Sequence, residues 1–208
     1  MKIVLHPTYF PSIATFVVIA QKDIIWEAFD NFQKQTYRNR CYICTDQGKH
    51  MMNIPIKHVG TNEGRQLYSD VVPDNSTPWQ KQHWRTLETA YRTSPYFEFY
   101  EDDLKPLYET YYLSLFDFNV KTIETILECL GIQKEFERTQ KFELQPENLL
   151  DGRFLVEAKK PFDFTFVAYG QVFEERHGFV ENLSILDLLF NEGPNTVDYL
   201  LDHSLEYL

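Results

Sequence analysis

The chain has 208 residues, of which 43% are hydrophobic and 25% charged, and its formal net charge is −11. The length suits one domain over residues 1–208, and the composition excludes a disordered chain. An acidic surface repels phosphate backbones, so no nucleic-acid partner is expected, although a local basic pocket can still bind a small anion.

The N-terminal stretch "KIVLHP" predicts a first strand that ends before Pro7. The next stretch, "PSIATFVVIAQ", has helical spacing, and Pro11 followed by Ser12 is typical of a helix start. Its apolar run over 13–20 is too short for a membrane span, so no membrane insertion is expected. Three cysteines, an odd and small number, favour a reducing compartment, and we expect a cytoplasmic protein.

Four further strands are predicted in the first third of the chain. "RNRCYICT" and "HMMNIPIKHV" alternate in polarity, and the intervening "DQGK" is typical of a hairpin turn. The four predicted strands cover residues 23–29, 38–45, 50–59 and 65–72.

Helical patterns dominate after this point. Residues 103–132 predict one long helix that starts near Leu104 and ends at Gly131. Near the C-terminus, Ser184 is a candidate N-cap for a helix that stops at Gly193. Strands followed by helices indicate an α+β fold, with a small mixed sheet from the N-terminal third packed against the later helices.

The stretch "TPWQKQHWRTLETAYRTSPYF" predicts a helix with Thr77 as N-cap and Pro78 as its first residue. At about 100° per residue, His83 falls in the middle of the apolar face, while Lys81 and Arg85 lie together on one flank. Two interpretations remain open. His83 is either a core histidine satisfied by a backbone carbonyl, with the flank solvated, or it reaches a cleft where it can transfer protons.

A second group of cations lies in "QKQTYRNRCYI". If the strand begins near Tyr37, Arg38 and Arg40 share one face, while Tyr37 and Asn39 share the other. Paired guanidinium groups suit the bidentate capture of a phosphate or carboxylate. The alternative is a charged edge strand that protects against aggregation.

His6 follows the first apolar strand at its carboxyl end, where sites of α/β proteins tend to lie, although a lone histidine there can also be structural. Cys41 and Cys44 stand three apart in an alternating run, which places them on opposite faces of a strand. No phosphate-loop, dinucleotide-binding or hydrolase motif is present, and the histidines are scattered. No metal site is therefore expected, and the residues indicate no cofactor.

Several segments together resemble the WbqC-like protein family. They are "HPTYFPSIATFVVIAQKDIIWEAFDNFQKQTYRNRCYI", "IPI", "QKQHWRTLETAYRTSPYF" and "GFVENLSILDLLFNEGP", in this order. The chain departs from the pattern at Ser12, where many members have Trp, and at Cys41, where many repeat Asn or Arg. The resemblance implies a role in bacterial surface-polysaccharide (O-antigen, lipopolysaccharide) biosynthesis and brings no catalytic residue set with it.

Two hypotheses from different classes follow. In the first, the protein is an enzyme, a group transferase acting on an anionic activated or carrier-linked substrate. His83 or His6 is the general base, Tyr9 orients, and the anion is bound by Arg38, Asn39, Arg40, Lys81 and Arg85. In the second, the protein is a non-catalytic ligand-binding or assembly protein of the same pathway, and these residues are structural. The shared site of the first hypothesis requires the two cationic groups to converge.

Overall fold

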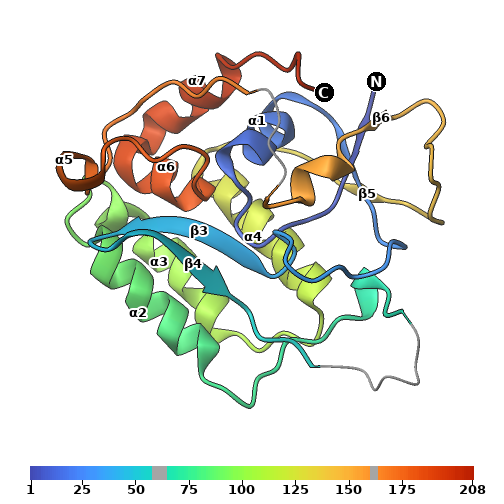
Figure 1. Ribbon diagram of the computed structural model, residues 1–208, viewed down its shortest axis with the longest axis horizontal. Helices are drawn as coiled ribbons and strands as arrows, with labels where there is room; N and C mark the ends of the chain where they lie inside the picture. Colours follow the sequence, from blue (N-terminus) through green and yellow to red (C-terminus); the bar gives the residue numbers. More distant parts are fainter. Residues whose placement is uncertain (58–64, 160–163) are drawn as a thin grey trace.

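The computed structural model describes residues 1–57, 65–159 and 164–208. Figure 1 shows helices and two small sheets, which confirms the α+β class. The strands do not join into one mixed sheet, however. One sheet is parallel and takes two of its four strands from beyond residue 130, and the other is a separate antiparallel hairpin.

The parallel sheet has the strand order β5-β2-β1-β6, and every neighbouring pair in it is parallel. Ile3 pairs with Ile24 on one side of β1 and with Leu150 on the other. The strands are β1 (Ile3–Leu5), β2 (Ile24–Trp26), β5 (Glu137–Arg138) and β6 (Leu150–Asp151).

Helix α1 (Ile13–Gln21) makes the crossover between β1 and β2, as parallel neighbours require. The helix starts where Pro11 and Ser12 predict it, and Ser12 is its N-cap, which accepts a hydrogen bond from the amide of Thr15. All residues from Ile13 to Ala20 are buried, so the helix is covered on every side. Among the residues described, no helix is both long and apolar enough to cross a membrane.

The antiparallel hairpin consists of β3 (Arg40–Thr45) and β4 (Gly48–Asn53), with its turn where "DQGK" predicts it. Gly48 has φ +92°, a conformation that favours glycine. The hairpin crosses the middle of the molecule in Figure 1, above α2 and α3 and below α1 and α6. The strand predicted over residues 50–59, the second of this hairpin, is longer than β4, and its residues 58 and 59 lie outside the described part of the chain.

The strand predicted over 65–72 is wrong, because this segment forms the 3-10 turn η1 (Tyr68–Asp70). The amide of Tyr68 donates to the carbonyl of Asp30, and its buried hydroxyl donates to the carbonyl of Pro7. The segment is therefore held by contacts with the loops after β1 and β2 rather than by a sheet ladder.

The single long helix predicted over 103–132 is two helices, α3 (Phe97–Glu109) and α4 (Leu115–Cys129). Helix α3 begins seven residues before Leu104, the predicted start, and has Pro106 in its interior. Ser114 starts α4 by accepting the amide of Asp117 at 3.1 Å. Gly131, with φ +67°, ends α4 as predicted.

Helix α2 (Trp79–Tyr91) begins one residue later than predicted, with Pro78 as an N-cap that lacks a side-chain hydrogen bond. The predicted cap at Thr77 is therefore wrong. Ser184 does cap α6 (Ile185–Glu192) as predicted. The remaining short elements are η2 (Arg153–Val156), α5 (Glu174–His177), η3 (Gly193–Asn195) and α7 (Thr196–Leu201).

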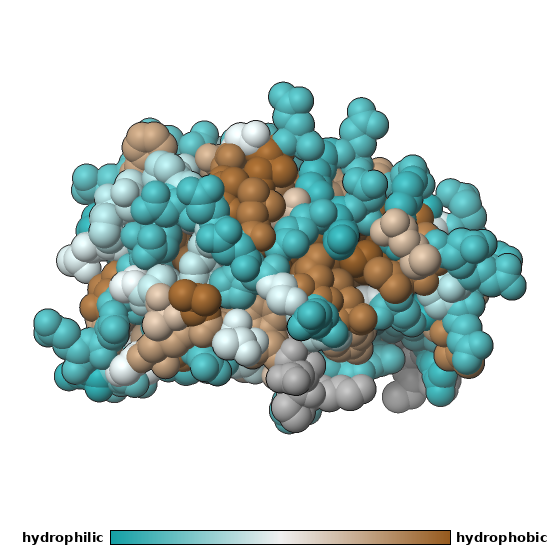
Figure 2. Space-filling model, turned by 90° about the horizontal axis from the view of Figure 1, so that it is seen from above, coloured by the Kyte–Doolittle hydropathy of each residue, from teal (hydrophilic) through white to brown (hydrophobic). Residues whose placement is uncertain are grey.

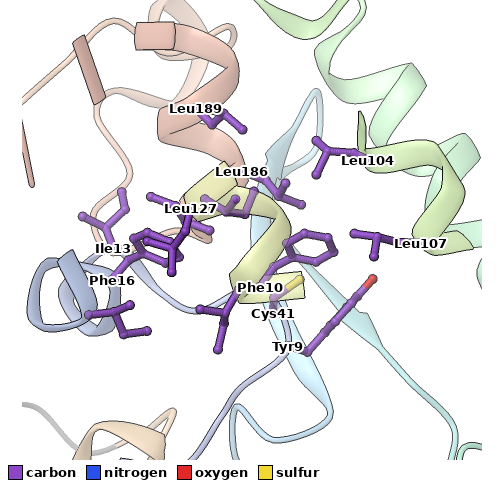
Figure 3. Close-up of a cluster of buried hydrophobic side chains, with 14 of the residues drawn as sticks. Tyr9, Phe10, Ile13, Phe16, Cys41, Leu104, Leu107, Leu127, Leu186 and Leu189 are labelled. Atoms are coloured by element: carbon purple, nitrogen blue, oxygen red, sulfur yellow. The ribbon is translucent and has the colours of Figure 1, made fainter. Parts of the chain in front are cut away.

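The hydrophobic core joins α1, α3, α4, α6 and the hairpin (Figure 3). Phe10 lies at its centre with φ +37°, a conformation that costs a bulky side chain energy. The carbonyl of Phe10 accepts the hydroxyl of Ser184 at 3.0 Å, which holds the loop in this shape. On the face seen in Figure 2, apolar side chains form separate patches between polar ones.

Gly193 is required where α6 ends. Its φ is +52°, and a Cβ there would lie 2.5 Å from the ring of Tyr96. We expect Gly193→Ala to lower the free energy of unfolding by about 2 kcal/mol, since it adds overpacking to backbone strain. Urea unfolding measures this loss. Gly131→Ala is the matched control, because its φ is also positive but nothing lies within 4 Å, so only about 1 kcal/mol is expected. Equal losses in both variants would contradict the packing argument.

Candidate functional site

Polar side chains follow all four strands of the parallel sheet. His6 comes directly after β1, Glu27 after β2 and Thr139 after β5, while Arg153 lies two residues beyond β6. Because the strands are parallel, these residues meet at one edge of the sheet, its carboxyl edge. The strand order reverses at β1, and ligands of open α/β sheets bind at such a point.

His6, Asp30 and Arg38 form a compact buried group at this edge. Nη2 of Arg38 donates to Oδ2 of Asp30 and to Nε2 of His6, each at 2.8 Å. The guanidinium also lies over the ring of Tyr68, with Cζ 5.4 Å from its centroid. Arg38 is only 1% exposed, so its charge depends on the carboxylate of Asp30 for compensation.

The ring of His6 is neutral at physiological pH. Burial is the main cause that lowers its pKa to about 4, and the charge of Arg38 adds to this effect against the opposing influence of Asp30. Arginine can only donate, so Nε2 of His6 is the acceptor and the ring proton lies on Nδ1. Oδ2 of Asp30 lies 3.1 Å from the same Nε2, a contact that becomes an ion pair only when the ring is protonated.

A second arginine is held at the same edge. Arg153 contacts the nearly buried carboxylate of Glu27 at 3.3 Å and that of Asp151 at 2.7 Å. Its hydrogen bonds lower the pKa of Asp151 against the effect of burial, and they raise the pKa of Arg153. Thr139 donates to Glu27 at 3.0 Å. Both arginines are thus already paired with carboxylates, so this edge is not an open patch of positive charge.

Several buried polar atoms near this edge have no hydrogen-bond partner among the described residues. Two adjacent chain segments supply five of them. One is an acceptor, Oδ1 of Asn39, and the other four are Nδ1 of His6, Oγ1 of Thr8, Nε of Arg38 and Nε of Arg40. The two segments run side by side, because the amide of Tyr9 donates to the carbonyl of Tyr37 at 3.1 Å. All four atoms can donate a hydrogen bond, and buried donors are normally paired.

Tyr9 and His83 meet elsewhere, inside the core. The hydroxyl of Tyr9 lies 2.9 Å from Nδ1 of His83 and 2.8 Å from the hydroxyl of Tyr108. Burial lowers the pKa of His83 to about 4, against a hydrogen bond with the backbone of Asn53. Burial also raises the pKa of Tyr9 well above its ordinary value. This arrangement supports the interpretation of His83 as a satisfied core histidine.

Within the described part of the chain, no hydrogen bond joins the predicted anion-binding residues to one another through their side chains. Asn39 donates to Oδ1 of Asn53 and to the carbonyl of Ile54, so it ties the hairpin to the following loop. Lys81 and Arg85 are exposed on α2, and no hydrogen bond or ion pair among the described residues connects them with Arg38. The convergence of the two cationic groups therefore stays a prediction.

Arg38 and Arg40 do not share a strand face either. β3 begins at Arg40, and the preceding residues form turns in which Gln35 has φ +65°. Arg38 is thereby turned into the core, while Arg40 stays half-buried and has no ion-pair partner within the described ranges.

Sequence reasoning missed Glu27, Asp30, Asp151 and Arg153. A signal existed for Glu27, because it follows the strand "IIW" just as His6 follows "IVL". Arg153 and Asp151 had no such signal, since β6 is two residues long and lies in an irregular stretch.

The N-terminus of α1 offers no free amide for a phosphate, although α1 follows β1 as phosphate-binding helices do. The amide of Ile13 donates to the carbonyl of Leu183, that of Ala14 to Oδ1 of Asn182, and that of Thr15 to Ser12. Within the described ranges, no three His, Cys, Asp or Glu side chains are close enough together to hold a metal ion.

Comparisons with known proteins place these residues in a wider context. The model of the WbqC-like protein family matches residues 6–163, which include His6, Asp30, Arg38 and Arg153. The chain is also 29% identical over 226 aligned residues to the uncharacterized protein Rv1507c of Mycobacterium tuberculosis, covering 95% of this chain and 96% of that protein. No solved structure matches this chain significantly.

Proposed function

The chain belongs to the WbqC-like protein family, and we propose that it is a cytoplasmic enzyme of bacterial surface-polysaccharide biosynthesis. We infer that it transfers a group to or from an anionic, activated substrate bound at the carboxyl edge of the parallel sheet. One observation carries this proposal. The buried donors of His6, Thr8 and Arg38 at this edge, and of Arg40 two residues further along the adjacent segment, lack acceptors among the described residues, and an oxyanion supplies acceptors.

Arg38 and Arg40 have different roles in this proposal. Arg40 binds the anion, because it forms no ion pair with a described residue and its Nε is buried. Arg38 is a positioning residue, since its Nη2 donates to Nε2 of His6 and thereby keeps the ring proton on Nδ1.

His6 acts as a proton donor in this proposal rather than as the general base that the sequence suggested. Its Nε2 accepts from Arg38, so the atom available to a substrate is Nδ1, which carries the proton. An anion bound beside the ring favours the imidazolium form and raises the pKa of His6 from about 4. Binding of the substrate therefore prepares His6 for proton transfer. Tyr9 and His83 keep their roles in the core.

Thermal unfolding with a panel of nucleotide sugars, nucleotides and simple phosphates tests the anion site. The substrate class at about a hundred times its dissociation constant should stabilise the wild type by about 2.7 kcal/mol, an increase in Tm on the order of 5 °C. The Arg40→Ala variant should lose most of this increase.

Lys34→Ala is the matched control, because Lys34 is an exposed cation six residues away in the same segment. This variant should respond to the ligand like the wild type. If both variants lose the response equally, the effect is one of net charge and the assignment of Arg40 is wrong.

A non-catalytic ligand-binding or assembly protein is the second candidate function. It is favoured by the fact that Arg38 and Arg153 are already paired with carboxylates, as structural ion pairs are. Under this alternative, no compound in the panel raises the melting temperature of the wild type, and Arg40→Ala lowers the stability of the protein without any ligand.

A further inference from the structure

A cleft of about 510 Å³ lies between the turn of the β3–β4 hairpin and α2, away from the sheet edge. The wall on the α2 side includes Gln82, Arg85, Thr86 and Thr89. His50 of β4 lies among the residues opposite. Its volume is within the range of small-molecule sites.

The walls of this cleft are held in place before any ligand binds. The carbonyl of Asp46, in the hairpin turn, accepts from Arg176 at 2.9 Å and contacts Nε2 of His177 at 3.0 Å. Figure 1 shows α5, which carries both residues, beside this turn. On the other side, the amide of Cys44 donates to the hydroxyl of Tyr91 in α2. The cleft is therefore preformed, which lowers the entropic cost of binding.

The charged groups of the cleft favour an anionic ligand over a cationic one. Arg85 has no ion-pair partner among the residues described, whereas Arg92 on the same helix pairs with Glu88 and Glu101. The carboxylate of Asp46, the acidic group of the lining, already accepts from Gln47 at 2.7 Å.

One apolar side chain completes the lining. Phe173, from the segment before α5, is half-buried against the core and lines the cleft. An aromatic face next to a cation suits a ligand with an apolar or sugar ring attached to an anionic group.

We propose that this cleft is a second binding site, which takes a small organic oxyanion that carries a ring. Arg85 and His50 bind the phosphate or carboxylate, Gln82 donates to it, and the ring lies on Phe173. The site is independent of the anion site at the sheet edge, because none of its lining residues belongs to that edge.

Isothermal titration with phenyl phosphate and with benzoate tests the proposal and distinguishes a phosphate site from a carboxylate site. The wild type should bind at least one of them, and Arg85→Gln should bind it about tenfold more weakly or worse, as expected for a lost charged hydrogen bond. Phe173→Ala should weaken the binding of phenyl phosphate but leave the binding of inorganic phosphate unchanged.

Lys81→Gln is the matched control, since Lys81 is exposed one turn earlier on α2 and does not line the cleft. It should bind like the wild type, as should Arg40→Ala, which separates this site from the sheet edge. Unchanged melting temperatures confirm that the variants are folded. The proposal is overturned if Lys81→Gln loses as much affinity as Arg85→Gln, or if neither compound binds the wild type at millimolar concentration.

Discussion

Arg38→Met is expected to lower the free energy of unfolding by about 3 kcal/mol or more, as the loss of one partner from a buried ion pair does. The substitution removes the donor of Asp30 and of Nε2 of His6 together, each 2.8 Å from Nη2. Methionine refills much of the volume under the ring of Tyr68, so the loss reports the polar contacts rather than a cavity.

Urea unfolding of three variants makes this measurement specific. Arg92→Met is the control, since its ion pairs with Glu88 and Glu101 are solvent-exposed and should contribute less than about 1 kcal/mol. The double variant Asp30→Asn/Arg38→Met should recover part of the loss, because it leaves no uncompensated carboxylate. A loss at Arg38 no larger than the loss at Arg92 would contradict the description of Arg38 as the buried centre of the group.

Acidification from pH 6.5 to pH 4 is expected to destabilise the protein strongly, by about 3 kcal/mol for each of His6 and His83. In both, burial lowers the pKa to about 4 in the folded protein, against 6.5 in the unfolded chain. Between these values the unfolded chain binds more protons than the folded one. Stability is therefore fully present above pH 6.5 and is lost as the pH falls towards 4.

Urea unfolding at several pH values between 4 and 7 measures this dependence. His6→Gln and His83→Gln should each remove about half of the change over this range, and the double variant should remove most of it. The lowered pKa values of Asp30 and Asp151 place their effect below pH 3.8. Burial raises the pKa of Asp187, so its protonation favours the folded protein as the pH falls and opposes the loss. A double variant with the full pH dependence of the wild type would contradict the assignment.

The behaviour of these variants also separates the two candidate functions. If Arg38 and His6 serve stability alone, their variants lose stability and no ligand stabilises the wild type. If they serve a substrate site, the ligand that stabilises the wild type should have a weaker effect on His6→Gln even at pH 7, where His6 is neutral and its variant is least penalised.

The sequence by itself determined the features that depend on a few neighbouring residues. Ser12 and Ser184 cap helices because a hydroxyl can reach the amides that follow it, and Gly131 ends α4 because glycine adopts a positive φ at little cost. His6 was predicted correctly at the end of a strand, because an apolar run followed by proline marks the end of a strand through neighbouring residues alone.

Only the tertiary structure decided what lies beside His6. Asp30 and Arg38 contact it from the segment after β2, and the charge of Arg153, from the turn after β6, acts on it. Strands β5 and β6 are too short to show a periodicity. Sheet pairing of this kind is non-local, so it depends on burial across the whole core rather than on any one segment.

The surroundings of the predicted anion-binding residues have the same cause. A turn at Gln35 delays the start of β3, which buries Arg38 and leaves Arg40 half-exposed, while the packing of α2 directs His83 inward and Arg85 outward. Arg38 thus lies at the sheet edge, His83 in the core and Arg85 at the hairpin cleft. Local sequence sets where a helix or strand begins, but the environment of a charged side chain is set by the elements that pack around it.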